Sequence, residues 1–337
     1  MSIPWLRAKQ HALANAQPLN VHLELTYRCN WRCVFCYNPR HSDRARLSLD
    51  EWRDVLDDLR TLGTLTITLT GGEPLASPDF FAIAHAARER HFAIRIFTNG
   101  ALIDDEAADR IVALQPYGVE ISIHGATADI HDRATARSGS FDAMLAGVDR
   151  LRERGIRPVL KMPLTSINEH QIDDVIALAN ARTLTLQIDP HLTPRDDGDM
   201  TPLSYAPSTA AIRRVFTLTR DELPLEQRQR GGSNCGLGRL TMAIDPEGNV
   251  YPCMQWRHRS LGNVRETRLA DLWHDAEGRK EAAAISVAAN DRLIDLGGAL
   301  ADFPFCPAIA MQRTGDALVP DDAFRMRAAI AAEVRAS

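Results

Sequence analysis

The residues of this sequence best suited to chemistry begin with three closely spaced cysteines, Cys29, Cys33 and Cys36. They follow an alternating run of apolar and polar residues at 21–25. A loop that leaves the end of a strand can surround one metal centre with three thiolates, which are soft ligands suited to iron-sulfur clusters and zinc. Three thiolates satisfy three irons of a four-iron cluster, so the fourth iron stays available for another ligand.

Three other interpretations fit such a triplet. Residues spaced i, i+4 and i+7 share a helix face, where cysteines act as small buried apolar residues, but the preceding strand and Pro39 disfavour a helix. A structural zinc site with His41 as the fourth ligand stays open from this stretch alone. A disulfide framework is typical of short secreted chains and fits a chain of 337 residues poorly.

A second motif, Gly71-Gly72-Glu73-Pro74, follows another extended run at 65–70. Glycines allow backbone conformations closed to other residues and let the main chain approach a ligand, and the proline stiffens the exit. A Gly-Gly pair alone usually marks only a turn. Carbonyl groups exposed at this turn could accept hydrogen bonds from an ammonium group held beside the open iron.

Together, the Cys29-x3-Cys33-x2-Cys36 spacing and the Gly-Gly-Glu-Pro motif resemble the radical S-adenosylmethionine (SAM) superfamily, over about residues 20–195. Phe35, the aromatic residue before the last cysteine, fits the same pattern. The resemblance implies that the three cysteines bind a four-iron cluster that injects an electron into the SAM sulfonium. This releases methionine and a 5′-deoxyadenosyl radical, which removes hydrogen from an unactivated carbon, while the protein places the reactants and excludes water.

The resemblance also implies SAM contacts at other strand ends. Ser122 matches a ribose-contacting position, Lys161 a position facing the SAM carboxylate, and Gln187 lies near the expected adenine side. His124 stands where similar enzymes often carry an aspartate. The expected cofactor-binding set is Phe35, Gly71, Gly72, Glu73, Pro74, Asn99, Ser122, Lys161 and Gln187. The last four could equally be ordinary polar groups satisfied at strand ends.

The elements that position these residues follow a repeating pattern in which an extended apolar run precedes an amphipathic run. This pattern predicts an α/β fold with a parallel sheet whose ligands lie at the carboxyl ends of the strands. The expected strands are 21–26, 65–70, 93–98, 119–124, 157–163 and 183–188, and the expected helices are 48–61, 78–91, 104–114, 141–154 and 169–181. Six units over about 165 residues suit a partial (β/α)6 barrel better than a closed barrel of roughly 250 residues. Ser48 with Glu51 predicts a capping box, and Gly63 and Gly155 predict helix ends.

The other three cysteines, Cys235, Cys253 and Cys306, lie in the last third of the chain. Two extended runs around residues 246–249 predict a hairpin that brings Cys235 near Cys253, and a helical stretch from residue 269 leads back to Cys306. The Gly248-x4-Cys253 pattern resembles the start of the cysteine-rich SPASM domain, or of its shorter relative the twitch domain, over about residues 232–310.

A full SPASM domain carries about seven cysteines and two clusters, so the resemblance supports at most one auxiliary iron-sulfur cluster on the three cysteines here. Its fourth ligand would be a side chain such as His258, or would be missing. Scattered buried cysteines are the alternative. The expected domains are a lead-in at 1–20, the partial barrel at 21–195, a linker and helix at 196–231, and a small α+β auxiliary-cluster domain at 232–337. Asp196, Asp197 and Asp199 of the linker are expected to be solvated loop acids rather than a metal site.

Composition excludes some partners. The formal net charge of −5 and pI near 6.1 give no electrostatic footprint for nucleic acid or an anionic membrane. The first residues show no cationic and apolar leader, and no apolar run could span a bilayer. A cytoplasmic location with reduced thiols is therefore expected.

Proteins of this architecture mostly modify ribosomally made peptides, by crosslinks or residue changes, so hydrogen abstraction from such a peptide is the first expectation. Oxidation or decarboxylation of a small metabolite, such as a sugar alcohol or a tetrapyrrole, is the second. A non-catalytic iron-sulfur carrier or sensor is the third, and the Gly-Gly-Glu-Pro motif argues against it. A flavodoxin or ferredoxin is the expected reductant. No catalytic acid or base is assigned among Asp189, His191 and His124.

Overall fold

A curved parallel sheet organises the chain. The computed structural model describes the fold of residues 3–337 and the side chains of residues 7–337, so part of the segment examined for a leader lies outside the described residues. All six predicted strands are present and parallel, which confirms the expected α/β partial barrel. They are β1 (Asn20–Glu24), β2 (Thr66–Thr70), β3 (Ala93–Thr98), β4 (Gly118–Ser122), β5 (Val159–Pro163) and β6 (Leu186–Asp189).

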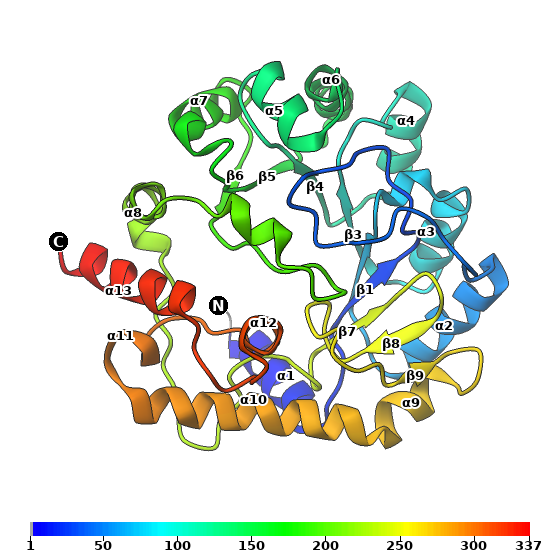
Figure 1. The fold of residues 1–337 in the computed structure, drawn as a ribbon. Coiled ribbons are helices and arrows are strands. Elements are labelled where there is room, and N and C mark those ends of the chain that lie inside the picture. The colour runs from blue at the N-terminus through cyan, green and yellow to red at the C-terminus, as the bar shows by residue number, and fades with distance from the viewer. Residues whose placement is uncertain (1–2) are drawn as a thin grey trace.

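The helices that connect these strands cover the outer face of the sheet (Figure 1). The five predicted ones are α2 (Leu49–Thr61), α3 (Phe80–Glu89), α4 (Asp105–Leu114), α6 (Ser140–Glu153) and α7 (Ile172–Ala181). The capping box of Ser48 and Glu51 is formed, and Gly63 and Gly155 take positive φ angles of 76° and 85° just after their helices. Apolar side chains of the sheet and of these helices form the main core, with Trp52 and Leu69 fully buried.

A short helix that the sequence did not predict, α5 (Ala128–Thr135), lies in the connection between β4 and α6. At eight residues it is too short for a clear hydrophobic period. Its last residues matter for the cysteine loop, because the carbonyl oxygens of Ala134 and Thr135 accept hydrogen bonds from the backbone N–H groups of Val34 and Arg32 at 3.0 and 2.9 Å.

The predicted hairpin is confirmed as β7 (Thr241–Ile244) and β8 (Asn249–Tyr251), which pair antiparallel. The sequence did not indicate where this hairpin attaches. β7 pairs parallel with β1, with Val21 opposite Met242, and β9 (Gly262–Asn263) completes a nine-stranded sheet in the order β6-β5-β4-β3-β2-β1-β7-β8-β9. The cysteine-bearing C-terminal region is thus joined to the barrel by main-chain hydrogen bonds.

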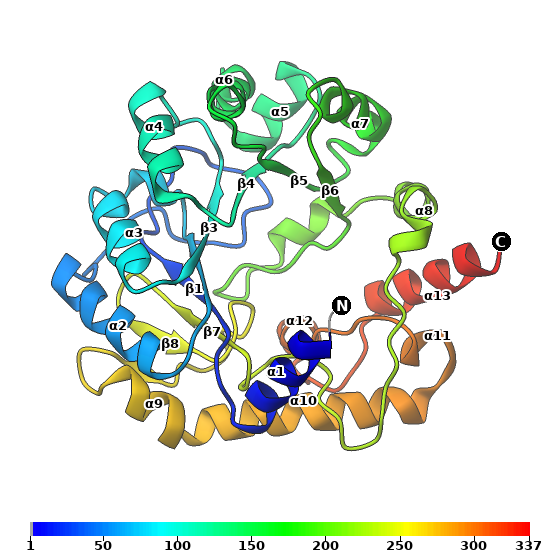
Figure 2. The same cartoon turned by 180° about the vertical axis from the view of Figure 1, so that it is seen from behind.

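The remaining helices lie mostly on the side of the barrel that the six βα units leave open (Figures 1 and 2). They are α1 (Ile3–Ala14), α8 (Thr209–Leu218), α9 (Leu269–Asp275), α10 (Glu277–Leu296), α11 (Gly298–Ala301), α12 (Pro307–Thr314) and α13 (Asp322–Ala336). Short 3₁₀ helices occupy Pro74–Ala76, Glu169–Gln171, Thr201–Tyr205 and Arg220–Glu222. None of the helices described is long and apolar enough to cross a membrane.

Candidate functional site

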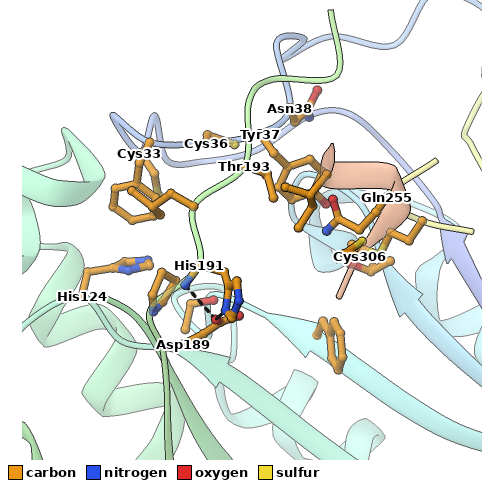
Figure 3. A pocket seen from close by; sticks show the side chains of 18 of the residues that line it. Cys33, Cys36, Tyr37, Asn38, His124, Asp189, His191, Thr193, Gln255 and Cys306 are labelled. Atoms are coloured by element: carbon orange, nitrogen blue, oxygen red, sulfur yellow. Dashed lines mark hydrogen bonds and ion pairs between the residues drawn. The ribbon is translucent and has the colours of Figure 1, made fainter. Parts of the chain in front are cut away.

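A cavity of about 530 Å³ lies at the carboxyl ends of the strands, where the sequence predicts the ligand site. Its volume falls in the range of ordinary small-molecule sites. One wall comes from the cysteine loop and the ends of β2, β3 and β4, and another comes from the C-terminal region (Figure 3). The first wall includes Cys29, Cys33, Cys36, Gly71, Gly72, Asn99 and Ser122, and the second includes Gln255, Phe305, Cys306, Phe324 and Arg327.

The three thiols of the cysteine loop are brought together in this cavity. Burial raises the pKa of Cys29 to about 11 and that of Cys33 well above its ordinary value, and the neighbouring thiols raise both further. The loop is anchored by Trp31, which is buried, and by a turn in which the Cys36 N–H donates to the Cys33 carbonyl at 3.0 Å. Without metal these groups are neutral thiols, and bound iron would invert that preference because its charge favours thiolates.

Gly71 and Gly72 line the cavity, but the closest backbone they face belongs to the cysteine loop. A β-carbon at Gly71 would stand 2.4 Å from the Thr26 carbonyl oxygen, and one at Gly72 would stand 2.4 Å from that of Arg28. The Gly72 N–H donates to the Thr26 carbonyl at 2.7 Å, and the Glu73 N–H donates to the Arg28 carbonyl at 2.9 Å. The two motifs found in the sequence therefore form one unit.

Glu73 lies buried beneath that unit. Its carboxylate accepts hydrogen bonds from Thr98 Oγ1 at 2.7 Å and from the backbone N–H groups of Leu75 and Asn99 at 3.1 and 2.7 Å. Burial raises its pKa to about 7, although these three donors favour the ionised form. Pro74 is buried beside it in a 3₁₀ turn. Neither residue lines the cavity, and Glu73 instead fixes the end of β3 relative to the glycine turn.

The other expected cofactor contacts fall into two groups. Phe35, Asn99 and Ser122 line the main cavity, and Asn99 Nδ2 lies 2.6 Å from Asn30 Oδ1 and 3.9 Å from Cys29 Sγ. Lys161 and Gln187 hydrogen-bond each other in a neighbouring cavity of about 390 Å³, and Lys161 Nζ lies 3.2 Å from Glu120 Oε2. Their roles toward SAM stay predictions.

Aromatic rings pack behind the cysteine loop. The His124 ring centroid lies 5.2 Å from that of Phe35 and 5.3 Å from that of His131, which in turn lies 5.3 Å from that of Trp31. Burial lowers the pKa of His131 to about 4 and that of His124 well below its ordinary value. Both imidazoles are therefore neutral in the folded protein at neutral pH.

These buried histidines make the free energy of unfolding depend on pH. The folded protein holds His131 neutral down to about pH 4, whereas the unfolded chain protonates it near pH 6.5, so its contribution is complete above pH 6.5 and is lost as pH falls toward 4. We expect this residue alone to lower the free energy of unfolding by about 2 kcal/mol between pH 7 and pH 5. Urea unfolding of the cluster-free protein tests this. The decrease in the free energy of unfolding between pH 7 and pH 5 should be smaller in His131→Gln and unchanged in His170→Gln, an exposed control. An equal decrease in both variants would contradict the prediction.

The second cysteine triplet also gathers in space. Burial raises the pKa of Cys306 to about 12, and the Cys253 and Cys235 thiols raise it further. Cys306 lines the main cavity, whereas Cys235 is exposed beside Ser286. In the described part of the chain, no three His, Cys, Asp or Glu side chains lie close enough to share a single metal ion. A four-iron cluster needs no such convergence, because each thiolate binds a different iron.

A buried ion pair ties the C-terminal region to the barrel. Arg257 Nη2 lies 2.7 Å from Glu24 Oε1 at the end of β1, and Arg257 Nε lies 3.8 Å from Asp196 Oδ2. The expectation that Asp196 is a solvated loop acid is therefore wrong for this residue. Its side chain is only 19% exposed, and burial raises its pKa to about 7. Asp197 is exposed, and Asp199 pairs with Arg195 at 3.2 Å.

Replacing Arg257 should be costly, because Glu24 would stay buried without a counter-charge. We expect Arg257→Met to lower the free energy of unfolding by about 3 kcal/mol or more. Arg259→Met is the control, since Arg259 is 59% exposed and its 3.0 Å pair with Glu281 should contribute less than about 1 kcal/mol. Denaturant titration of both variants measures these free energies of unfolding. A loss in Arg257→Met as small as that in Arg259→Met would show that the buried ion pair is dispensable.

Comparisons with known proteins match both halves of the chain. The family model of the radical SAM superfamily matches residues 23–180, and that of SPASM, an iron-sulfur cluster-binding domain, matches residues 235–294. The mycofactocin maturase MftC of Mycobacterium ulcerans is 32% identical over 253 residues, which cover 70% of this chain and 68% of that protein. The chain belongs to the radical SAM superfamily.

Other similar proteins agree with this placement. MftC of Mycobacterium tuberculosis is also 32% identical over 70% of this chain, but the match spans only 64% of its length. The PqqA peptide cyclase of Ruegeria pomeroyi is 28% identical over 77% of this chain and 74% of that protein. The fold resembles that of Streptococcus suis SuiB bound to SAM, with a TM-score of 0.71 and 16% identity over 96% of this chain and 83% of that one.

The residues present fit the cofactors of both families: a SAM-binding four-iron cluster for radical SAM proteins and an auxiliary iron-sulfur cluster for the SPASM domain. Each triplet offers three thiols and no fourth cysteine. The cavity between them is mostly apolar, which suits a reaction from which water must be kept out. Its polar groups stand at the strand ends and on the C-terminal wall, where Gln255 and Arg327 lie.

Sequence reasoning missed the C-terminal wall of this radical SAM site. Met254, Gln255, Phe324 and Arg327 line the cavity, and no motif or spacing marks them. Phe324 and Arg327 reach it because α13 lies across the barrel opening (Figure 1), and Met254 and Gln255 reach it because the β7–β8 hairpin before them pairs with β1. The one available signal was that Met254 and Gln255 directly follow Cys253.

Proposed function

We propose that this radical SAM protein cleaves SAM reductively at a four-iron cluster held by Cys29, Cys33 and Cys36, and abstracts hydrogen from a ribosomally synthesised peptide. The product would be a crosslink or another residue modification. The observation that carries this proposal is the single cavity that Cys29, Cys33 and Cys36 share with Cys306. A substrate held there would contact both the site of radical formation and a ligand of the auxiliary cluster.

The cofactor arrangement follows from the wall that carries the cysteine loop. With the cluster and SAM bound, the site would supply a 5′-deoxyadenosyl radical. Gly71 and Gly72 would present backbone groups to SAM, braced from below by Glu73 and Pro74, while Phe35, Asn99 and Ser122 line the same space. Cys235, Cys253 and Cys306 would hold the auxiliary cluster, which could take up an electron from the substrate radical or bind the substrate.

A peptide is the substrate class that the relatives favour. Two of them are a mycofactocin maturase and a peptide cyclase, names that describe maturation and peptide modification. The cavity, at about 530 Å³, would take one or two residues of an extended segment. A flavodoxin or ferredoxin would reduce the cluster, in a cytoplasmic setting that keeps the thiols reduced.

The test begins with oxygen-free reconstitution and a count of iron and sulfide. About eight irons per chain, with 5′-deoxyadenosine formed from SAM under a strong reductant, would support two clusters and radical chemistry. Peptides translated from short reading frames beside the gene would then be incubated with the enzyme and examined for a mass change. SAM cleavage that changes no such peptide would favour a small metabolite, and no cleavage by a reduced cluster would favour a carrier or sensor.

A further inference from the structure

Arg327 is a buried arginine that lines the main cavity, and the proposed reaction gives it no role. It lies on α13, is 5% exposed and lines the main cavity. No hydrogen bond or ion pair joins its guanidinium to any side chain described in residues 7–337, and its Nε is buried without a partner. Buried charges in proteins are normally paired, so an unpaired guanidinium at a cavity wall indicates that its partner is a ligand.

The acids nearest to Arg327 are already engaged. Asp321 accepts a hydrogen bond from the Phe324 N–H at 2.8 Å as the N-cap of α13, and its Oδ1 lies 3.7 Å from Arg313 Nη1. Asp189 accepts from the His191 N–H at 2.9 Å, and its Oδ1 lies 2.8 Å from His191 Nδ1. Neither carboxylate comes within 4 Å of Arg327, so the guanidinium fork is free on the cavity side.

Arg313, the second arginine near this wall, shows the contrast. Its side chain is 14% exposed, and its Nη2 donates to the Leu192 carbonyl at 2.7 Å in addition to facing Asp321. Arg313 therefore serves the protein's own structure. Besides Asp321 and Asp189, the cavity lining includes apolar side chains of the C-terminal region, namely Pro304, Phe305, Ile309 and Phe324. A carboxylate there would be desolvated and strongly held, because a guanidinium binds it through two parallel hydrogen bonds.

We propose that Arg327 is the receptor for a carboxylate of the substrate, either the terminal carboxylate of a peptide or an aspartate or glutamate side chain. This inference rests on the proposed peptide function and names the group by which the substrate would be held. Arg327 belongs to the C-terminal wall, whereas the expected SAM-binding residues that line the same cavity stand on the cysteine loop and the ends of β2 to β4. Lys161 and Gln187 lie on β5 and β6 and line the neighbouring cavity. Figures 1 and 2 both show α13 across the barrel opening from β1 to β3. The anion thus enters with the substrate while SAM occupies the other wall.

The experiment uses the reconstituted holoenzyme with SAM present and three pools of acetylated pentapeptides. The first pool has free C-terminal carboxylates and no acidic residues, the second has C-terminal amides and one aspartate or glutamate, and the third has C-terminal amides and no acid. Retention of each pool is measured by affinity selection with mass spectrometry. We expect one carboxylate pool to be retained about tenfold more than the neutral pool, and which pool it is identifies the source of the carboxylate.

Variants assign that preference to Arg327. Arg327→Gln should lose it, Arg327→Lys should keep part of it, and Arg325→Gln should keep all of it, because Arg325 is an exposed residue of the same helix. Arg327→Gln should melt no lower than wild type, since it removes an unpaired buried charge; a purely structural arginine would give a lower melting temperature.

Three results would overturn the inference: equal retention of all pools by wild type, a carboxylate preference that survives in Arg327→Gln, or weaker SAM binding by Arg327→Gln without peptide, which would assign the guanidinium to SAM. Failure of the proposed function is recognised separately, because it would appear in wild type as the absence of 5′-deoxyadenosine.

Discussion

Changing Cys29, Cys33 and Cys36 together to alanine is expected to abolish 5′-deoxyadenosine formation, to less than about one thousandth of the wild-type rate. The reason is chemical, because reductive cleavage of SAM needs an iron with an open position, and these are the only thiols of the cysteine loop. Iron content should fall by about four per chain. Product formation by liquid chromatography and iron analysis of the same sample measure both effects.

The matched variant replaces Cys235, Cys253 and Cys306 instead. It should also lose about four irons, yet it should still cleave SAM, because the cysteine loop is braced by Gly72, Glu73 and α5 and not by the second triplet. Substrate turnover should be lost in both. If the second variant cleaves no SAM while its first cluster is intact, the two triplets do not have the separate roles proposed for them.

Gly72→Ala is expected to cause the second largest effect. An added β-carbon would stand 2.4 Å from the Arg28 carbonyl oxygen and 2.6 Å from that of Tyr27, distances at which backbone must move. The same movement would break the 2.7 Å and 2.9 Å hydrogen bonds that join the glycine turn to the cysteine loop. We expect a loss of about 2–4 kcal/mol in the free energy of unfolding, and a reconstituted protein that binds the first cluster poorly.

Gly118→Ala provides the control for that variant. Gly118 begins β4, and an added β-carbon there would have no atom within 4 Å. Its effect on stability should stay within about 0.5 kcal/mol, with full iron content. Urea titration of the cluster-free proteins and iron analysis after reconstitution compare the two. A Gly72→Ala protein as stable and iron-rich as the control would show that the turn can shift without disturbing the cysteine loop.

Local patterns in the sequence determined the scaffold and the ends of its strands. Alternating apolar residues with amphipathic runs between them specify βα units, and the Ser48–Glu51 capping box and Gly63 mark helix ends through contacts within a few residues. The cysteine motif and the glycine turn could be identified from the sequence for the same reason. Each lies within a short stretch whose chemistry depends on residue type and separation.

Tertiary structure alone decided what faces those motifs. The sequence predicts that Glu73 contacts the cofactor. The fold instead places it beneath the cavity, where it accepts hydrogen bonds from Thr98 and Asn99 at the end of the next strand. Asp196 reads as a loop acid, but Arg257, more than sixty residues later, removes it from solvent. Arg327 carries no sequence signal at all, and reaches the cavity because α13 packs across the barrel opening. Such contacts join residues far apart in the chain, so their partners are set by how helices and sheet pack and not by local spacing.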